Sequence, residues 1–235
     1  MKNTLFILIF FFYLTPIFSQ KIEGKITYLA TSKNAIKYIK EKKTKKSAVI
    51  DIYKRAKDVE VVLKFNETIS EYYTLEKIDL DNKNGYNFTH IMAGGEKKYY
   101  TYNSTMKYKN ETLDCYLLGD CFLIENNLPK WNLKQDTKKI QGFLCYKAIL
   151  NNPRNNKIIL EAWYTPKIPY QYGVMNYYGL PGLILEINKN TFTITATKIE
   201  LNPLEKIKIE EPKGFKKLSY KEFKEILKKN SPFKD

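Results

Sequence analysis

Histidine and cysteine are scarce in this chain, which has one histidine and three cysteines among 235 residues. Zinc sites are built from clustered cysteine and histidine, and neither a CxxC pair nor a Cys/His spacing occurs, so we expect no metal ion. His90 is the sole imidazole and there is no GxSxG motif, so the sequence gives no support to nucleophilic catalysis. We therefore expect a protein that is not an enzyme and that uses no cofactor.

Long apolar runs are also missing, except at the N-terminus. Lys2 precedes the apolar run 5–14 (LFILIFFFYL), and the following break ends with Ser19 before Gln20. This run is shorter than the roughly twenty residues of a membrane span, so the pattern predicts a secretory signal peptide over residues 1–19. We expect an exported protein that is periplasmic, secreted or associated with the outer membrane, with at most peripheral membrane contact.

The odd number of cysteines leaves one thiol over if a disulfide forms in an exported chain. Cys115 and Cys121 flank a Gly-Asp turn, whereas Cys145 lies in a long predicted strand that should run near residues 122–125. Either pairing is geometrically open. The nearer pair closes the shorter loop, which favours a Cys115–Cys121 bond with Cys145 as a free, buried thiol.

The net charge is strongly positive at +15, from 40 Lys and Arg against 25 Asp and Glu. Exported proteins seldom meet nucleic acid, so we expect no nucleic-acid partner and regard anionic lipid, lipopolysaccharide or acidic glycan as better fits. Lysine is scattered through every segment, however, and scattered charge is typical of a solvated surface. We favour that second interpretation.

Short segments rich in β-branched and aromatic residues recur along the chain, separated by turn residues. About ten such strands with no helix between them predict a mainly β fold, built on a single antiparallel sheet. A sheet of about ten strands does not stay flat, so we expect a strongly curved sheet or half-barrel. No linker or repeat divides the chain, which predicts one domain over residues 20–235.

Helices are few in this pattern. A capping box at Ser219–Glu222, followed by an apolar face, predicts a C-terminal helix near Tyr220 to Lys229 that packs on the sheet. Residues 32–46 fit a loop or a frayed basic helix, and residues 48–56 fit a short helix or a strand.

The stretch 177–187 (YYGLPGLILEI) places a Gly-Leu-Pro-Gly turn directly before an aliphatic strand. Pro181 presets one turn position, and Gly179 and Gly182 tolerate positive φ. A phosphate cradle would need further glycines, a lysine and a following helix, but a strand follows here. We interpret this motif as structural.

An aromatic loop comes just before that turn. The segment 162–169 (AWYTPKIP) ends a strand with two prolines, and residues 170–178 (YQYGVMNYY) then hold four tyrosines and a methionine. Such a loop fits recognition of an apolar or sugar ligand. The rings can instead cover an open end of the sheet, and we favour this second interpretation. The candidate ligand-binding residues are Tyr170, Tyr172, Met175, Tyr177 and Tyr178.

Three motifs occur in an order that resembles the GLPGLI family of exported Bacteroidetes proteins: 130–148 (KWNLKQDTKKIQGFLCYKA), 162–169 (AWYTPKIP) and 179–187 (GLPGLILEI). The resemblance covers roughly residues 131–200. It implies a Gram-negative cell-envelope location but no catalytic residue, because the role of that family is not established. The matching motif positions are Trp163, Tyr164, Pro166, Pro169, Gly179, Leu180, Pro181, Gly182, Leu183 and Ile184.

Two functions of different classes follow. The leading hypothesis is a non-enzymatic envelope protein that binds or carries an apolar or lipid-like ligand on a concave sheet face, with residues 170–178 at its rim. The alternative is a structural or interaction protein that docks an envelope partner through a sheet edge or its basic surface. An enzyme comes third, because no catalytic geometry can be read.

Overall fold

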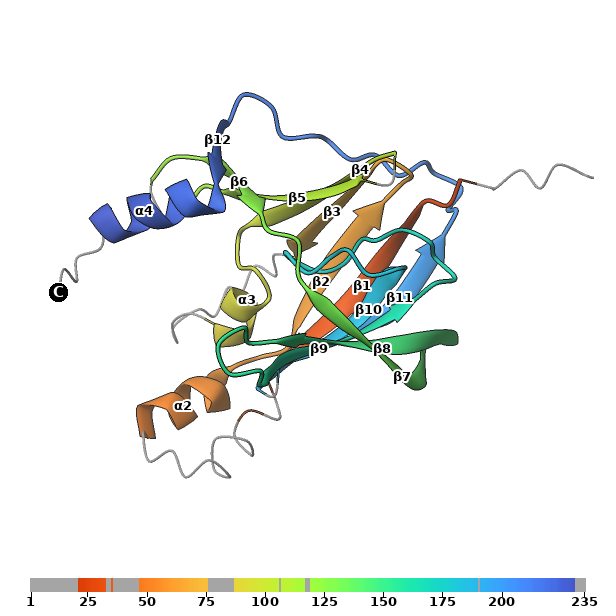
Figure 1. The fold of residues 1–235 in the computed structure, drawn as a ribbon, viewed down its shortest axis with the longest axis horizontal. Coiled ribbons are helices and arrows are strands. Elements are labelled where there is room, and N and C mark those ends of the chain that lie inside the picture. The colour runs from red at the N-terminus through yellow and green to blue at the C-terminus, as the bar shows by residue number, and fades with distance from the viewer. Residues whose placement is uncertain are drawn as a thin grey trace, which may run out of the picture.

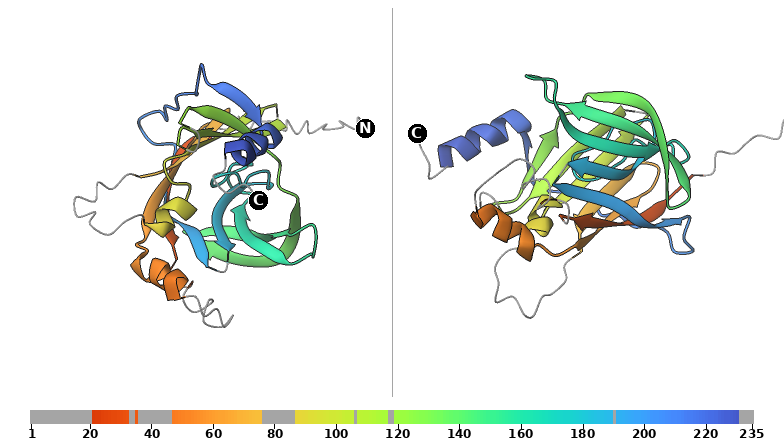
Figure 2. Two further views of the ribbon diagram at one scale, coloured as in Figure 1. Left: turned by 90° about the vertical axis from the view of Figure 1, so that its left-hand side faces the viewer. Right: turned by 90° about the horizontal axis from the view of Figure 1, so that it is seen from below.

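In the part of the chain that the structure describes, the fold is one large sheet with helices α2, α3 and α4 at one end (Figures 1 and 2). The computed structural model describes residues 21–32, 35, 47–75, 87–105, 107–116, 119–189 and 191–230, so the predicted signal peptide lies outside the described residues. The strands are β1 (Gly24–Thr31), β2 (Val59–Phe65), β3 (Ile69–Thr74), β4 (Lys98–Ser104), β5 (Lys107–Asp114), β6 (Phe122–Asn126), β7 (Trp131–Ile140), β8 (Phe143–Asn151), β9 (Ile158–Thr165), β10 (Leu183–Lys189), β11 (Phe192–Leu201) and β12 (Lys216–Ser219). The helices are α2 (Ser47–Arg55), α3 (Phe88–Met92) and α4 (Tyr220–Asn230).

The sheet has 12 strands in the order β12-β6-β5-β4-β3-β2-β1-β11-β10-β9-β8-β7. It therefore consists of two antiparallel meanders, β1 to β6 and β7 to β11, which are joined where β1 pairs with β11. Residues 127–130 alone connect β6 to β7. Because four residues reach only about 14 Å, this link brings one corner of each meander near the other.

Two details of the predicted sheet are wrong. The sheet is mixed rather than wholly antiparallel, because β12 pairs in parallel with β6. Parallel strands are joined by a crossover rather than by a hairpin, and here β7 to β11 together with residues 202–215 lie between β6 and β12 in sequence. The sheet is also open, with β12 and β7 as free edges, instead of being a strongly curled half-barrel.

The main core lies on one face of the sheet, here called the inner face. The first strand shows why, since Ile26, Tyr28 and Ala30 are fully buried and alternate with half-buried residues. Side chains of a strand alternate between the two faces of a sheet, so one face of β1 packs in the core and the other is partly exposed to water. Aliphatic residues of β2, β10 and β11 continue the same core.

The C-terminal helix is confirmed and begins with the predicted capping box. The Ser219 backbone N–H donates to the Glu222 carboxylate at 2.8 Å, and the Glu222 N–H donates to the Ser219 hydroxyl at 3.2 Å. Phe223 packs against a small second core with Ile124 of β6 and Leu218 of β12. Within the described part of the chain, no helix is long and apolar enough to cross a bilayer.

The stretch that fitted helix and strand equally well forms α2, which packs beside α3 with the rings of Tyr53 and Phe88 in edge contact at 5.0 Å. The motif segments are sheet neighbours, because β7, β8, β9 and β10 lie side by side. The structure has the disulfide Cys115–Cys121 in the β5–β6 connection, and Cys145 is a buried free thiol in β8.

Candidate functional site

The tyrosine-rich loop packs on the core instead of forming a rim around an open face. It belongs to residues 166–182, here called the strap segment, which connect β9 to β10 and cross the inner face (Figure 1). Tyr172, Met175 and Tyr178 are buried, while Tyr170 and Tyr177 are half-buried. Three of the five predicted ligand-binding side chains are therefore covered by the chain itself.

Hydrogen bonds attach the strap segment to both meanders. The Trp131 indole N–H of β7 donates to the Tyr178 carbonyl at 2.8 Å, and the Asn110 amide of β5 donates to the Met175 carbonyl at 3.2 Å. The Tyr178 hydroxyl in turn donates to the Asn126 carbonyl at the end of β6. These contacts satisfy backbone carbonyls that would otherwise be buried without partners.

The Gly-Leu-Pro-Gly turn ends the strap segment and has the predicted conformation. Gly179 has φ 85° and Gly182 has φ 146°, so both glycines adopt positive φ. A Cβ atom at Gly182 would overlap the Thr165 carbonyl oxygen and lie 2.9 Å from Cα of Pro166. Space as well as φ therefore requires glycine here, and the motif is a turn that brings the chain close to β9.

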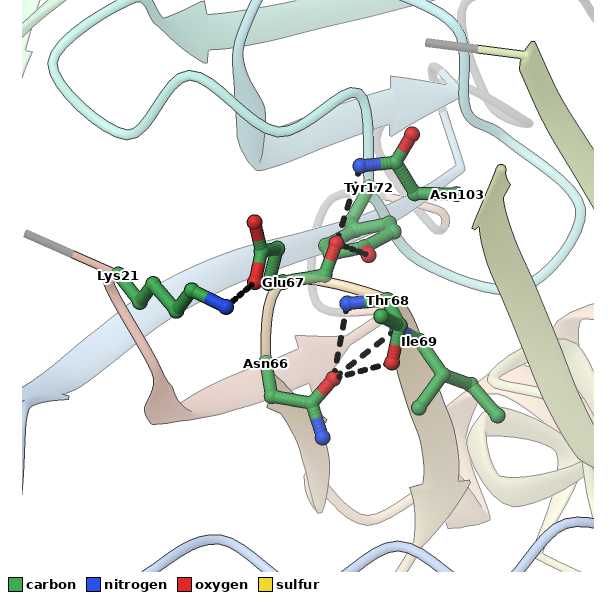
Figure 3. Close-up of polar contacts among 7 residues, drawn as sticks. All are labelled: Lys21, Asn66, Glu67, Thr68, Ile69, Asn103 and Tyr172. Carbon is green, nitrogen blue, oxygen red and sulfur yellow. Dashed lines mark hydrogen bonds and ion pairs between the residues drawn. The ribbon is translucent and has the colours of Figure 1, made fainter. Parts of the chain in front are cut away.

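A hollow of about 450 Å³ lies on the surface at the end of the sheet opposite the described helices. It opens where the start of β1, the β2–β3 turn and the end of β11 meet, and Figure 3 shows its central turn. The hollow is lined by Lys21, Ile22, Glu23, Asn66, Glu67, Thr68, Asn202, Pro203 and Lys206.

The β2–β3 turn owes its shape to Asn66. The Asn66 side-chain oxygen accepts from the Thr68 N–H at 3.0 Å and from the Ile69 N–H at 3.1 Å, so the amide nitrogen is directed away from the turn (Figure 3). Lys21 pairs with Glu67 at 2.7 Å across the hollow. From behind, the Tyr172 hydroxyl and the Asn103 amide both donate to the Glu67 carbonyl. The turn is thus fixed on both sides.

Four aromatic rings lie behind this turn: Phe65, Tyr108, Tyr170 and Tyr172. The rings of Tyr170 and Tyr172 stack at 5.4 Å, and Tyr108 meets Tyr172 edge-on at 5.7 Å. Burial raises the pKa of Tyr170, and the nearby Glu67 carboxylate raises it further. The Tyr170 phenol therefore stays neutral at ordinary pH and can act as a hydrogen-bond donor beside the hollow.

The predicted site residues are thus divided by the structure. Tyr170 and Tyr172 lie at or behind the hollow, whereas Met175 and Tyr178 serve as anchors of the strap segment. Tyr177 lies against Trp131, with the Lys189 ammonium 5.0 Å from its ring centre. Among the motif residues, Trp163 is on the outer face, where the Lys138 ammonium lies 4.4 Å from its ring centre.

Sequence reasoning missed most of the hollow itself. It identified Asn66-Glu67 as a turn, and Asn202-Pro203 carries a comparable turn signal. Neither signal says that the two turns lie side by side, because that depends on the pairing of β1 with β2 and with β11. The site is a product of strand order.

Comparison with known proteins gives one family match. Residues 150–186, from the end of β8 to the middle of β10, match the model of a family described as a protein of unknown function (Porph_ging). This stretch contains the strap segment and lies within the region that resembles the GLPGLI family, but membership of that family is not confirmed. No curated protein matches the chain.

Solved structures show the fold in other proteins. Structures of PNGF-II in C2 and P21 crystals are similar at TM-scores of 0.53 and 0.52, each with 16% sequence identity. The match covers 88% of this chain and 32% of the PNGF-II chain in the C2 form, and 87% and 32% in the P21 form. A lipoprotein-sorting protein domain from Vibrio parahaemolyticus gives a TM-score of 0.30 at 7% identity, covering 78% of this chain and 87% of that domain. At these identities the PNGF-II comparison shows a shared fold, and this chain spans about one third of the PNGF-II length.

Proposed function

We propose that this is an exported cell-envelope protein that binds a small, hydroxyl-rich ligand such as a sugar, without transforming it. The observation that carries the proposal is the hollow beside Tyr170, where amide, hydroxyl and charged groups converge on a rigid turn. Ligand sites typically combine a concavity with a few well-placed polar groups and an aromatic surface. The envelope location rests on the signal-peptide pattern.

The burial of the strap segment favours a polar ligand over a lipid-like one. A carrier of an acyl chain needs an accessible apolar chamber, but the inner face is packed with Tyr172, Val174 and Leu180 from this segment. An acyl chain could enter only if the strap segment left the core and lost its hydrogen bonds to both meanders. The hollow needs no such rearrangement.

Docking of a partner strand onto a sheet edge is less well supported as a function, since features of both free edges oppose pairing with another strand. On β7 the register shifts between Leu133 and Thr137, and the intervening residues 134–136 include two charges. The other edge, β12, has four residues and runs directly into α4. Bulges, charges and short strands are the means by which proteins block pairing at an edge.

Calorimetric titration of residues 20–235 with a panel of envelope-derived mono- and oligosaccharides tests the proposal. The test variant, Thr68→Val with Lys206→Ala, changes one hydroxyl and one ammonium in the hollow. Its control, Thr197→Val with Lys213→Ala, makes the same changes at exposed positions outside it. We expect at least a tenfold rise in Kd for the test variant alone, equal to about 1.4 kcal/mol.

Native mass spectrometry of protein purified from its own envelope provides the independent control. A retained polar ligand that the hollow variant loses supports the site. A retained acyl lipid, or equal sugar affinities for the test and control variants, would contradict it.

A further inference from the structure

The three described helices lie at the end of the sheet opposite the hollow, with α2 beside α3 and with α4 apart from them, against β6 and β12 (Figure 2). We call α2, α3 and α4 the helical end. It is separated from the hollow by the length of β2, which follows α2 and ends at Phe65, just before the β2–β3 turn. Seven strand residues span roughly 23 Å, so the two ends are distinct surfaces.

Basic side chains outnumber acidic ones on the helices of the helical end. The last turn of α2 carries Lys54 and Arg55, and the last turn of α4 carries Lys228 and Lys229, all exposed. The only acidic residue of α2 is Asp51, which pairs with Lys54 at 3.4 Å.

Exposed apolar side chains accompany this charge. Ile52 of α2 is 42% exposed, Ile91 of α3 is 53% exposed, and Tyr220 at the start of α4 is 40% exposed. The Tyr220 ring also lies 4.7 Å from the Lys224 ammonium. A surface that lies on a bilayer combines apolar groups with basic ones in this way.

We propose that the helical end docks this protein peripherally on a bilayer of anionic phospholipid. Lysine and arginine meet the phosphate groups, and each contributes on the order of 1 kcal/mol near such a surface. Ile52 and Ile91 enter the headgroup region. An acidic protein surface would match the charge but would leave both isoleucines without an apolar environment. The hollow then faces away from the membrane, although the docking does not depend on what the hollow binds.

Flotation of residues 20–235 with vesicles tests the proposal. One set contains phosphatidylethanolamine with about one quarter phosphatidylglycerol, and the other contains phosphatidylcholine alone. We expect binding to the anionic vesicles only, weakened by high salt because the Debye length shortens. Lys54→Glu with Lys228→Glu should lower the partition coefficient at least about tenfold, since two cations become anions.

Two further variants keep the result interpretable. Lys139→Glu with Lys198→Glu reverses two exposed lysines away from the helical end and should bind like the parent protein. Ile52→Ser with Ile91→Ser leaves the charge unchanged and should lower binding several-fold, with a matching far-UV spectrum. Equal losses for the two charge variants, full binding by the isoleucine variant, or equal binding to neutral vesicles would each overturn the proposal.

Discussion

The two meanders line the same interior with different chemistry. In β7 to β11, here called the apolar meander, the inner face is aliphatic and aromatic, with Ala162, Ile187 and Ile194 fully buried. In β1 to β6, here called the polar meander, one row of the same face on β3 to β6 is polar. Its four members pair directly across the strands: Ser70, Thr101, Asn110 and Asn126.

Three members of the polar row, Thr101, Asn110 and Asn126, are joined by hydrogen bonds. The Asn110 amide donates to the Thr101 hydroxyl at 2.8 Å, and the Asn126 amide donates to the Asn110 side-chain oxygen and to the Thr112 hydroxyl, both at 2.7 Å. Burial of apolar area is non-directional, so the apolar side chains stabilise the fold without fixing one position for the strap segment. Hydrogen bonds are directional, and the polar row supplies one of them, from Asn110 to the Met175 carbonyl. Trp131 of the apolar meander supplies another, to the Tyr178 carbonyl, so both meanders place the strap segment while apolar burial adds stability.

The largest effect should come from the turn by which the strap segment enters β10. Gly182→Ala places a Cβ atom against the Thr165 carbonyl oxygen at positive φ, so we expect a loss of about 3 kcal/mol or failure to fold. Gly142→Ala is the control, since its φ is +80° and nothing lies within 4 Å of its Cβ. The control should lose about 1 kcal/mol in urea unfolding. If both variants lose the same free energy of unfolding, positive φ alone accounts for the loss, and the close approach of the Thr165 carbonyl adds nothing.

The next test compares the meanders directly. Asn110→Leu leaves the partners of Asn110 buried and unsatisfied, so we expect a loss of about 3 kcal/mol, similar to Ile194→Ala in the apolar meander. Adding Asn126→Leu should cost less in the Asn110→Leu background than alone, because the two side chains share one network. Adding Asn126→Leu to Ile194→Ala should be additive. Additivity in both backgrounds would remove the distinction between the meanders.

Several elements of this fold could be predicted from local sequence because local chemistry determines them. The α4 cap depends on Ser219 and Glu222, and the turn before β10 depends on Gly179 and Gly182. The parallel pairing of β12 with β6 could not be predicted, since no local turn sets it. The same holds for the hollow, where residues near 21, 66 and 202 meet only through strand order.

The aromatic loop shows a second limit of sequence reasoning. Four tyrosines in nine residues fit a binding rim and a core strap equally well, because the tyrosine ring is apolar and its hydroxyl needs one partner. For Tyr172 that partner is the Glu67 carbonyl, which lies 105 residues away in sequence. A contact between residues so far apart leaves no pattern in the local sequence around either of them.

A smaller effect concerns Cys145 in the apolar meander. Burial raises the pKa of the Cys145 thiol from 9.0 to about 11. A raised thiol pKa means that the folded state holds the proton more tightly, so its stabilising contribution is complete below pH 9 and is lost between pH 9 and 11. We expect Cys145→Ala to lack up to about 2 kcal/mol of the alkaline loss seen in the parent protein. Identical losses from pH 8 to pH 10.5 in urea unfolding would contradict this.

The smallest effect belongs to the second core, where α4 joins the polar meander. Hydrogen bonds from the Ser219 hydroxyl and N–H lower the pKa of Glu222 below its ordinary value of 4.5. A lowered carboxyl pKa stabilises the folded state above pH 4.5, and this contribution disappears as the pH falls through the folded-state value. Carbon-13 NMR of the Glu222 carboxyl should therefore show a midpoint below 4.5, with fraying of the first turn of α4 in the same window.

Ser219→Ala is the matched change for this helix cap. It removes the hydroxyl that Glu222 binds at 2.7 Å, so the Glu222 midpoint should move back toward 4.5 while the sheet amides keep their shifts. The effect should stay local because α4 packs mainly against β6 and β12, through Ile124 and Leu218. If the amides of β3 to β5 shifted together with Glu222, the second core would be part of the polar meander rather than an attachment to it.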